Sequence, residues 1–363
     1  MQRRKRSPKP SLIILLFVAL LAGCTPLAKD TGDSQEYEPV SESEFLMGTV
    51  VKLTIFDEAE EAEALFRKAF ERIAEIEEKM TINDEHEKSE ITRLNQEAGK
   101  GFVKLSPETF YVLEKGKYYS EISNGKYDIT IGPLVKLWNI GSDEARVPRK
   151  TEIENTLSLV NYQNLLLDKE KMSARLAVPG MIVDLGSIAK GYAADETAKI
   201  LKEAGIKHAI VNLGGNILVL NERPDGTPWR IGLQDPFTAR GDYMGIVKLE
   251  DESLVTSGTY ERYFEDGGKR YHHILNPETG YPEENSLLSV SIITKNSIDA
   301  DGLSTATFLL GLEKGMQFIE GLPDTEAIFI TSDKKVYVTS GISKEKFEIT
   351  KEEYQLVQSG VVP

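Results

Sequence analysis

Residues 181–192 read Met-Ile-Val-Asp-Leu-Gly-Ser-Ile-Ala-Lys-Gly-Tyr, and this stretch joins a strand to a helix. The apolar residues before Asp184 predict a strand that ends there, and a glycine two residues later permits a close turn. Ser187 is placed to cap a helix that we expect to end before Gly205. The N–H groups at such a helix start attract phosphate, and Lys190 adds a cation in the first turn. A capped junction without a ligand is the alternative.

The elements on either side of this junction predict a mixed α+β fold. Helices are expected over 58–80, from Ser106-Pro107 to about Ile122, and over about 299–312 and 314–321. Strands are expected over 49–56, 217–220, 243–249, 289–294, 327–331 and 335–338. Strands and helices follow one another without a regular βαβ rhythm, and this favours α+β over a doubly wound sheet.

The first 24 residues carry the parts of an export signal. Five basic residues precede an apolar run over 12–22, which is too short for a membrane span of about 20 residues. The string Leu21-Ala22-Gly23-Cys24 resembles a bacterial lipobox, in which the cysteine sulfur receives a diacylglycerol. Two acyl chains would hold the protein at a membrane. An uncleaved signal anchor with an incidental cysteine is the alternative.

These features predict the organisation of the whole chain. We expect a lipoprotein signal peptide over 1–23, and a lipidated Cys24 followed by a flexible tether that extends to residue 44. A single domain is expected over 45–363. The protein would be exported and anchored by lipid to the outer face of the cytoplasmic membrane, or on the periplasmic side.

Composition excludes several classes of protein. With one cysteine among 363 residues, no disulfide can form within the chain, and a net charge of −15 argues against a nucleic-acid partner. Removal of residues 1–23 takes away five basic residues and no acidic ones, so the net charge of the remaining chain is −20. The sequence has no P-loop, GxGxxG fingerprint, CxxC pair or HExxH helix. Attraction for an anionic ligand must therefore be local.

Two further strings place polar groups at turns. Residues 212–216 read Asn-Leu-Gly-Gly-Asn, where paired glycines either form a plain hairpin turn or let the backbone approach another group closely. In the string over 123–138, Asn124-Gly125 is a strong turn, and Tyr127 and Asp128 follow on a segment expected to be extended. An aromatic ring beside a carboxylate suits a flat heterocycle, whereas a core tyrosine and a turn aspartate are the alternative.

Two more strings carry candidate catalytic or metal-binding groups. His272 and His273 are expected on a strand, so they point to opposite faces and one can be a general base. The other two histidines, His86 and His208, are expected to be structural or exposed. In the string over 299–305, Asp301 and Thr305 share a helix face, with Ser304 adjacent. A carboxylate with hydroxyls suits Mg²⁺, and a helix-capping aspartate is the alternative.

In their order and spacing, these strings resemble the ApbE family of FAD:protein FMN transferases. The matching strings begin with Met47-Gly48-Thr49 and continue through 127–138, 184–192, 212–216, 256–262 and 273–280 to 301–305. The resemblance implies a single body of mainly antiparallel sheets with packed helices, whose central cleft holds FAD with Mg²⁺ at the pyrophosphate. One departure is Ile82, which stands where the family usually has an aromatic residue after Met80-Thr81. Gly186-Ser187 also differs from a segment that is often richer in glycine.

The resemblance also implies roles for individual residues. The residues that would line FAD are Met47, Lys126, Tyr127, Asp128, Asp184, Lys190, His273 and Leu275. The Mg²⁺ ligands would be Asp301 and Thr305, helped by Ser187, Ser304 or the Ala189 carbonyl. His273 is the candidate to accept or orient the proton of the attacking hydroxyl, and Asp301 is the alternative base.

The activity implied by the resemblance is transfer of FMN from FAD to a threonine of a partner protein, with release of AMP. The partner would be a subunit of an electron-transfer system, such as a sodium-pumping or Rnf-type complex. Two other functions stay open: hydrolysis of FAD to FMN and AMP at the same site, and an exported flavin-binding lipoprotein without catalysis.

Overall fold

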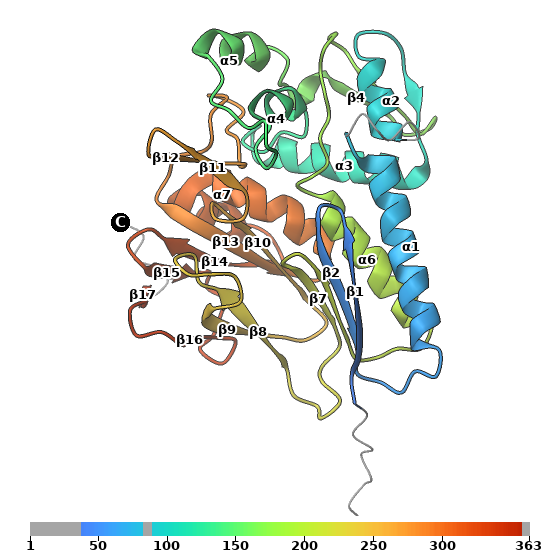
Figure 1. Cartoon of the computed structure of the whole chain (residues 1–363), viewed down its shortest axis with the longest axis vertical. Helices are drawn as coiled ribbons and strands as arrows, with labels where there is room; N and C mark the ends of the chain where they lie inside the picture. Colours follow the sequence, from blue (N-terminus) through green and yellow to red (C-terminus); the bar gives the residue numbers. More distant parts are fainter. Residues whose placement is uncertain (1–37, 83–88, 358–363) are drawn as a thin grey trace, which may run out of the picture. The chain divides into compact units, whose positions relative to one another are not determined.

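A nine-stranded sheet forms the centre of the chain in a computed structural model that describes residues 38–82 and 89–357 (Figure 1). The predicted signal peptide, Cys24 and His86 lie outside these residues. The strands, in their order across the sheet, are β1 (Val40–Leu46), β2 (Thr49–Ile55), β6 (Ala209–Leu213), β7 (Asn216–Leu220), β10 (Ser253–Gly258), β13 (Leu287–Thr294), β14 (Glu326–Thr331), β15 (Lys335–Val338) and β17 (Gln355–Val357). All neighbouring strands are antiparallel except β15 with β17, which confirms the expected α+β fold with mainly antiparallel pairing.

Both faces of this sheet are covered. The helices α6 (Ala189–Glu203) and α7 (Ser297–Glu320) lie on one face, and α1 (Ala62–Met80) packs against α6 (Figure 1). A small sheet lies against the other face, in the order β16 (Phe347–Ile349), β9 (Tyr243–Leu249) and β8 (Trp229–Gln234). The central strands are therefore buried on both sides, as their nearly continuous apolar sequences require.

Smaller elements complete the described chain above the helices in Figure 1. They include α2 (Glu90–Gln96), α3 (Pro107–Ile122), α4 (Gly132–Trp138), α5 (Lys150–Leu157), a 3₁₀ turn (Tyr162–Asn164), and a sheet of β3 (Val103–Lys104), β5 (Ser173–Leu176) and β4 (Leu165–Asp168). A separate hairpin consists of β11 (Tyr263–Asp266) and β12 (Lys269–His272). Within the described ranges, no helix combines the length and the apolar character needed to cross a membrane.

The structure corrects two local expectations and confirms a third. Among the described residues the first strand, β1, begins at Val40, inside the stretch expected to be a tether, because it is an exposed edge strand held through its backbone pairing with β2. Tyr127 lies in a bend and Asp128 follows it outside any strand, rather than on an extended segment. The two helices expected over about 299–312 and 314–321 are confirmed, because α7 is interrupted at Gly311, whose φ is 76°, and the chain is helical on both sides of it.

Candidate functional site

The site is built where α6 and α7 touch near their first turns. A Cβ atom on Gly191 of α6 would lie 2.3 Å from the carbonyl oxygen of Ser297 in α7, so only glycine allows this approach. The contact brings Asp301 of α7 to the start of α6. Its Oδ2 accepts a hydrogen bond from the Gly191 N–H at 2.9 Å, and its Oδ1 lies 3.4 Å from the Lys190 ammonium. Asp301 is 3% exposed, so this ion pair is largely shielded from water.

A cluster of hydroxyl groups lies beside Asp301. The Oγ of Ser257 in β10 is 2.8 Å from the Oγ of Ser304 and 3.2 Å from the Oγ1 of Thr305, both in α7. Ser304 also donates to the carbonyl oxygen of Asp301 at 2.9 Å. The expected sharing of one helix face by Asp301 and Thr305 is confirmed, since α7 spans both residues. Sequence reasoning missed Ser257, because only the pairing of β10 with β13 brings it under α7.

The oxygen atoms of this cluster are suitable ligands for a hard cation. No group of three His, Cys, Asp or Glu side chains converges anywhere in 38–82 and 89–357 in a way that could hold a metal ion. The groups near Asp301 are one carboxylate and several hydroxyls, all of them oxygen donors. Mg²⁺ prefers oxygen ligands, and it commonly takes only one or two from protein carboxylates and the rest from phosphate and water.

The loop before α6 carries a second carboxylate and a serine that contacts a tyrosine from the loop after α3. Ser187 donates to the hydroxyl oxygen of Tyr127 at 2.9 Å, and the N-cap position of α6 is Ile188, so the expected capping by Ser187 is wrong. The Oδ1 of Asp184 accepts from the Gly186 N–H at 2.7 Å. Burial raises the pKa of the Asp184 carboxyl above its ordinary value, while the positive charges of neighbouring side chains, among them Lys190, oppose this rise. Burial likewise raises the pKa of Tyr127, which therefore keeps its proton.

His273 is held by the backbone of Arg262, where the chain enters and leaves the β11–β12 hairpin. The His273 N–H donates to the Arg262 carbonyl oxygen at 3.1 Å, and Nδ1 of its ring lies 3.2 Å from the same oxygen. Because a carbonyl can only accept, this bond places the ring proton on Nδ1 and leaves the lone pair on Nε2. Burial lowers the pKa of His273 to about 3, and the charges of Arg262 and Lys190 contribute, so the ring is neutral at pH 7.

The other described histidines have structural contacts. His272 is buried, its Nε2 bonds to the Glu283 carbonyl oxygen at 2.9 Å, and its ring meets Phe308 edge-on at 5.9 Å. The Nδ1 of His208 lies 2.5 Å from the Oδ1 of Asp57. Of the adjacent pair, His273 is the one whose pKa the positive charges of Arg262 and Lys190 lower.

Two hairpin turns meet at the end of the central sheet nearest the site. Met47 and Gly48 join β1 to β2 with φ angles of 52° and 68°, and the Met47 N–H donates to the Glu77 carboxylate at 2.8 Å. Gly214 and its neighbouring glycine join β6 to β7 in the same way. A Cβ atom on Gly214 would lie 2.0 Å from the Oγ1 of Thr49. The paired glycines thus serve as a hairpin turn and also allow a close approach, so both interpretations of that string hold.

Three of the predicted FAD-lining residues have other contacts in the structure. Both carboxylate oxygens of Asp128 accept hydrogen bonds, Oδ1 from the N–H and the hydroxyl of Thr130 at 2.7 Å, and Oδ2 from the N–H of Tyr162, which begins the 3₁₀ turn, at 2.8 Å. Lys126 forms an ion pair with Glu278. Leu275 is 6% exposed and packs in an apolar cluster with Trp138. Their roles toward FAD stay predictions.

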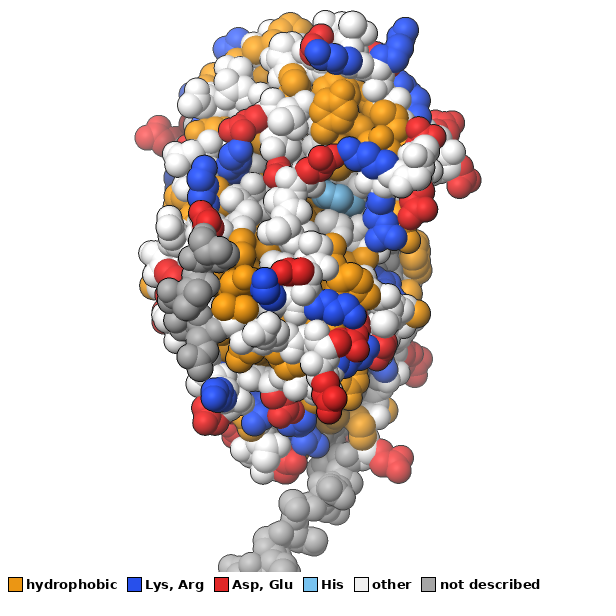
Figure 2. All heavy atoms as spheres, turned by 90° about the vertical axis from the view of Figure 1, so that its left-hand side faces the viewer, with side chains coloured by type: hydrophobic (Ala, Val, Ile, Leu, Met, Phe, Trp, Pro, Cys, Tyr) orange, Lys and Arg blue, Asp and Glu red, His pale blue; other side chains and the backbone are white. Residues whose placement is uncertain are grey.

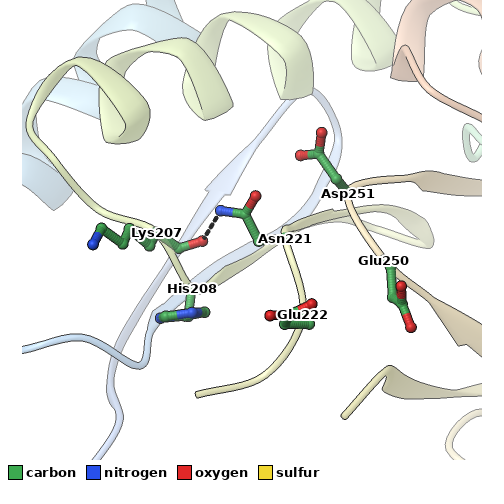
Figure 3. Close-up of a pocket in the computed structure, with 6 residues that line it drawn as sticks. All are labelled: Lys207, His208, Asn221, Glu222, Glu250 and Asp251. Carbon is green, nitrogen blue, oxygen red and sulfur yellow. Dashed lines mark hydrogen bonds between the residues drawn. The ribbon is translucent and has the colours of Figure 1, made fainter. Parts of the chain in front are cut away.

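Charged side chains of both signs are mixed on the surface of this chain. The face shown in Figure 2 presents a histidine with Lys, Arg, Asp, Glu and hydrophobic side chains around it. A separate hollow lies beyond the C-terminal end of α6 and is lined by Lys207, His208, Asn221, Glu222, Glu250 and Asp251 (Figure 3). It contains none of the predicted site residues, and α6 separates it from Lys190 by about 20 Å.

The model of the ApbE family matches residues 47–329. The chain belongs to the ApbE family. A protein of Klebsiella pneumoniae named FAD:protein FMN transferase is 39% identical over 300 residues, which cover 83% of this chain and 92% of that protein. A Treponema pallidum protein of the same name is 34% identical, with coverage of 83% and 87%.

Solved structures of the ApbE family share the fold. The ApbE protein of Thermotoga maritima superposes with a TM-score of 0.76 at 30% identity, covering 84% of this chain and 97% of that chain. The flavin transferase ApbE of Vibrio cholerae superposes with a TM-score of 0.75 at 29% identity, with the same coverage. The expected family and fold class are thereby confirmed.

Proposed function

We propose that this ApbE-family protein transfers FMN from FAD to a threonine hydroxyl of a partner protein, forms a phosphoester and releases AMP. The observation that carries the proposal is the Asp301–Lys190 pair beside a cluster of hydroxyl groups, together with a neutral His273 whose pKa the Lys190 charge helps to lower. The names of the relatives supply the donor, FAD, and the class of acceptor, a protein. Phosphoryl transfer needs positioning and charge stabilisation more than covalent chemistry, and this site offers both.

The oxygen donors beside Asp301 would hold Mg²⁺. The set is Asp301, Thr305, Ser304, Ser187 and the Ala189 carbonyl. When bound, the ion would neutralise charge on the phosphate oxygens of FAD. Lys190 would share that task, because its ammonium already lies beside the Asp301 carboxylate.

The transfer follows from the roles of the chain's own groups. The threonine oxygen attacks the phosphorus on the FMN side of the pyrophosphate, a new P–O bond forms, and the bond to the AMP oxygen breaks. The threonine proton passes to Nε2 of His273, which carries the lone pair when Nδ1 donates to the Arg262 carbonyl. Asp301 is the alternative base, although its Oδ2 already accepts from the Gly191 N–H.

The remaining predicted residues would bind and orient FAD. They are Met47, Lys126, Tyr127, Asp128, Asp184, Lys190, His273 and Leu275. The anionic pyrophosphate would favour the protonated imidazole of His273 and raise its pKa from about 3, which would strengthen it as a proton acceptor during the reaction.

We also propose the placement that the N-terminal sequence suggests. Residues 1–23 would be removed, Cys24 would carry the lipid, and the folded domain would act outside the cytoplasm. The acceptor would be an exported or membrane-bound electron-transfer subunit. Replacement of Cys24 by Ser should move the protein from the membrane fraction to the soluble fraction, and retention of that variant in the membrane would contradict lipidation.

Mass spectrometry of a threonine-bearing acceptor, incubated with the protein, FAD and Mg²⁺, tests the transfer. We expect the acceptor to gain the mass of one FMN and AMP to appear in equal amount. His273→Ala and Asp301→Ala should abolish both signals, whereas His208→Gln, at the far end of α6, should keep them. Free FMN with an unmodified acceptor would instead support FAD hydrolysis. Bound FAD without AMP would support a flavin-binding protein without catalysis.

A further inference from the structure

Asn216 carries a buried amide group without a partner. It is the first residue of β7, directly after the Gly214-Gly215 turn, and it is 3% exposed. Among the described residues its Nδ2 has no hydrogen-bond partner, although it is shielded from solvent. Burial of an unpaired donor is unfavourable, and such a group in a folded protein requires an explanation, which a bound ligand can supply.

The register of the sheet places this amide beside the hydroxyl cluster. Side chains alternate along a strand, so Asn216 shares a face with Leu218, which belongs to the core that includes α6 and α7. Leu218 pairs with Ser253 and the preceding residue, Ile217, pairs with Leu254, so one further step in the same antiparallel register sets Asn216 opposite Val255. Ser257 lies two residues beyond Val255 on that face, as a diagonal neighbour within about 8 Å of Asn216.

The same location identifies the kind of group that the amide would meet. Ser257 bonds to Ser304 and Thr305, and these residues lie beside the Asp301–Lys190 pair. A neutral N–H donor at this position is suited to an oxygen that carries negative charge and no proton.

We propose that Asn216 is a further substrate-binding residue, whose amide N–H donates to a phosphate oxygen of the bound dinucleotide next to Ser257 and Thr305. This inference rests on the proposed function, since it takes FAD as the ligand. The side-chain N–H group of Asn216 has a hydrogen-bond acceptor only when the ligand is present. Asn216 therefore contributes to ligand binding and not to the stability of the free protein.

The opposite end of β7 provides a matched control. The Nδ2 of Asn221, the residue after β7, donates to the Lys207 carbonyl oxygen at 2.7 Å, as drawn in Figure 3. Asn221 is therefore an amide that is satisfied within the protein and lies far from the hydroxyl cluster. Its removal should affect folding stability and leave FAD binding unchanged.

The test measures thermal unfolding of the free protein and its affinity for FAD by flavin fluorescence with Mg²⁺. Asn216→Ala should leave the melting temperature unchanged or raised and weaken FAD binding about tenfold. Asn216→Asp should weaken it further, because an ionised carboxylate cannot donate and repels phosphate. Asn221→Ala should lower the melting temperature alone. Unchanged FAD affinity in both Asn216 variants would overturn the proposal, as would a fall in melting temperature with unchanged affinity.

The binding measurement separates this proposal from the proposed function. If the wild-type protein binds FAD and transfers no FMN, the proposed transfer fails, whereas weaker FAD binding by Asn216→Ala still supports the role of the amide. If the wild-type protein does not bind FAD, the proposal for Asn216 is overturned as well.

Discussion

The contact between α6 and α7 at Gly191 can be tested with a single methyl group. Gly191→Ala would place a Cβ atom 2.3 Å from the Ser297 carbonyl oxygen, 2.6 Å from the carbonyl carbon and 2.7 Å from the Ile298 Cα. All three atoms are backbone, so no side chain can rotate to make room. The helices must separate by roughly 1 Å to reach ordinary contact distances.

Two opposing effects decide the change in stability. Alanine favours a helix interior over glycine by about 1 kcal/mol, while overpacking against a rigid neighbour costs about 1–3 kcal/mol. The net loss of unfolding free energy should therefore be about 0–2 kcal/mol, and the variant should fold. The larger effect falls on the site, because the separation lengthens the bond between the Gly191 N–H and Asp301. A displacement of about 1 Å can reduce catalysis about 100-fold.

The assay combines urea unfolding with FMN transfer to a threonine-bearing acceptor. Gly191→Ala should lose roughly 100-fold in transfer rate with a small loss of stability. The matched control is Gly101→Ala, since a Cβ atom at Gly101 meets nothing within 4 Å and its rate should be that of the wild type. A wild-type rate and stability for Gly191→Ala would refute the reasoning that helix contact sets the geometry of Asp301.

Three further predictions concern charged groups. Burial raises the pKa of Asp195 to about 6, so its carboxyl binds a proton more tightly in the folded than in the unfolded state. The free energy of unfolding should therefore fall by about 3 kcal/mol as the pH rises from about 3 to about 7. Asp195→Asn should remove this pH dependence in urea titrations at each pH. Lys190→Met should lower the transfer rate at least 10-fold with a melting temperature within a few degrees of wild type, and an unchanged rate would contradict its role. Asp128→Ala should lower the free energy of unfolding by about 3 kcal/mol, because it leaves the N–H groups of Thr130 and Tyr162 without an acceptor; an unchanged midpoint in urea would contradict this.

The sequence alone was sufficient to predict helices and strands whose apolar residues recur at regular spacing. The predicted helix after Ser187, the helix ending at Ile122 and the strand starting at Thr49 all have counterparts in α6, α3 and β2. The edge strand β1 was missed because its side chains are mostly exposed and polar, so no alternation marks it. Its position depends on backbone pairing with β2, such as Phe45 opposite Val50, which composition does not reveal.

Only the part of the site that consists of residues close together in the sequence could be predicted. Asp301 and Thr305 share a helix face by their spacing alone, and the sequence shows that spacing directly. Ser257 joins them only through strand register and helix packing, which involve residues far apart in the chain. Ser187 was predicted to cap α6, but its hydroxyl bonds to Tyr127 across 60 positions, so a tertiary contact replaced the local one.

The first turns of α6 and α7 are tied to one another by carboxylates. Asp195 of α6 accepts from the N–H groups of Ser297 and Ile298, at 2.7 and 2.9 Å, and Asp301 of α7 accepts from the Gly191 N–H. These bonds occupy N–H groups that would otherwise attract an anion, and they place negative charge where we had expected the helix start of α6 to hold phosphate. A phosphate at this position would therefore be repelled unless cations intervene. Lys190 supplies one, and the oxygen donors around Asp301 suit a divalent ion that would supply the rest.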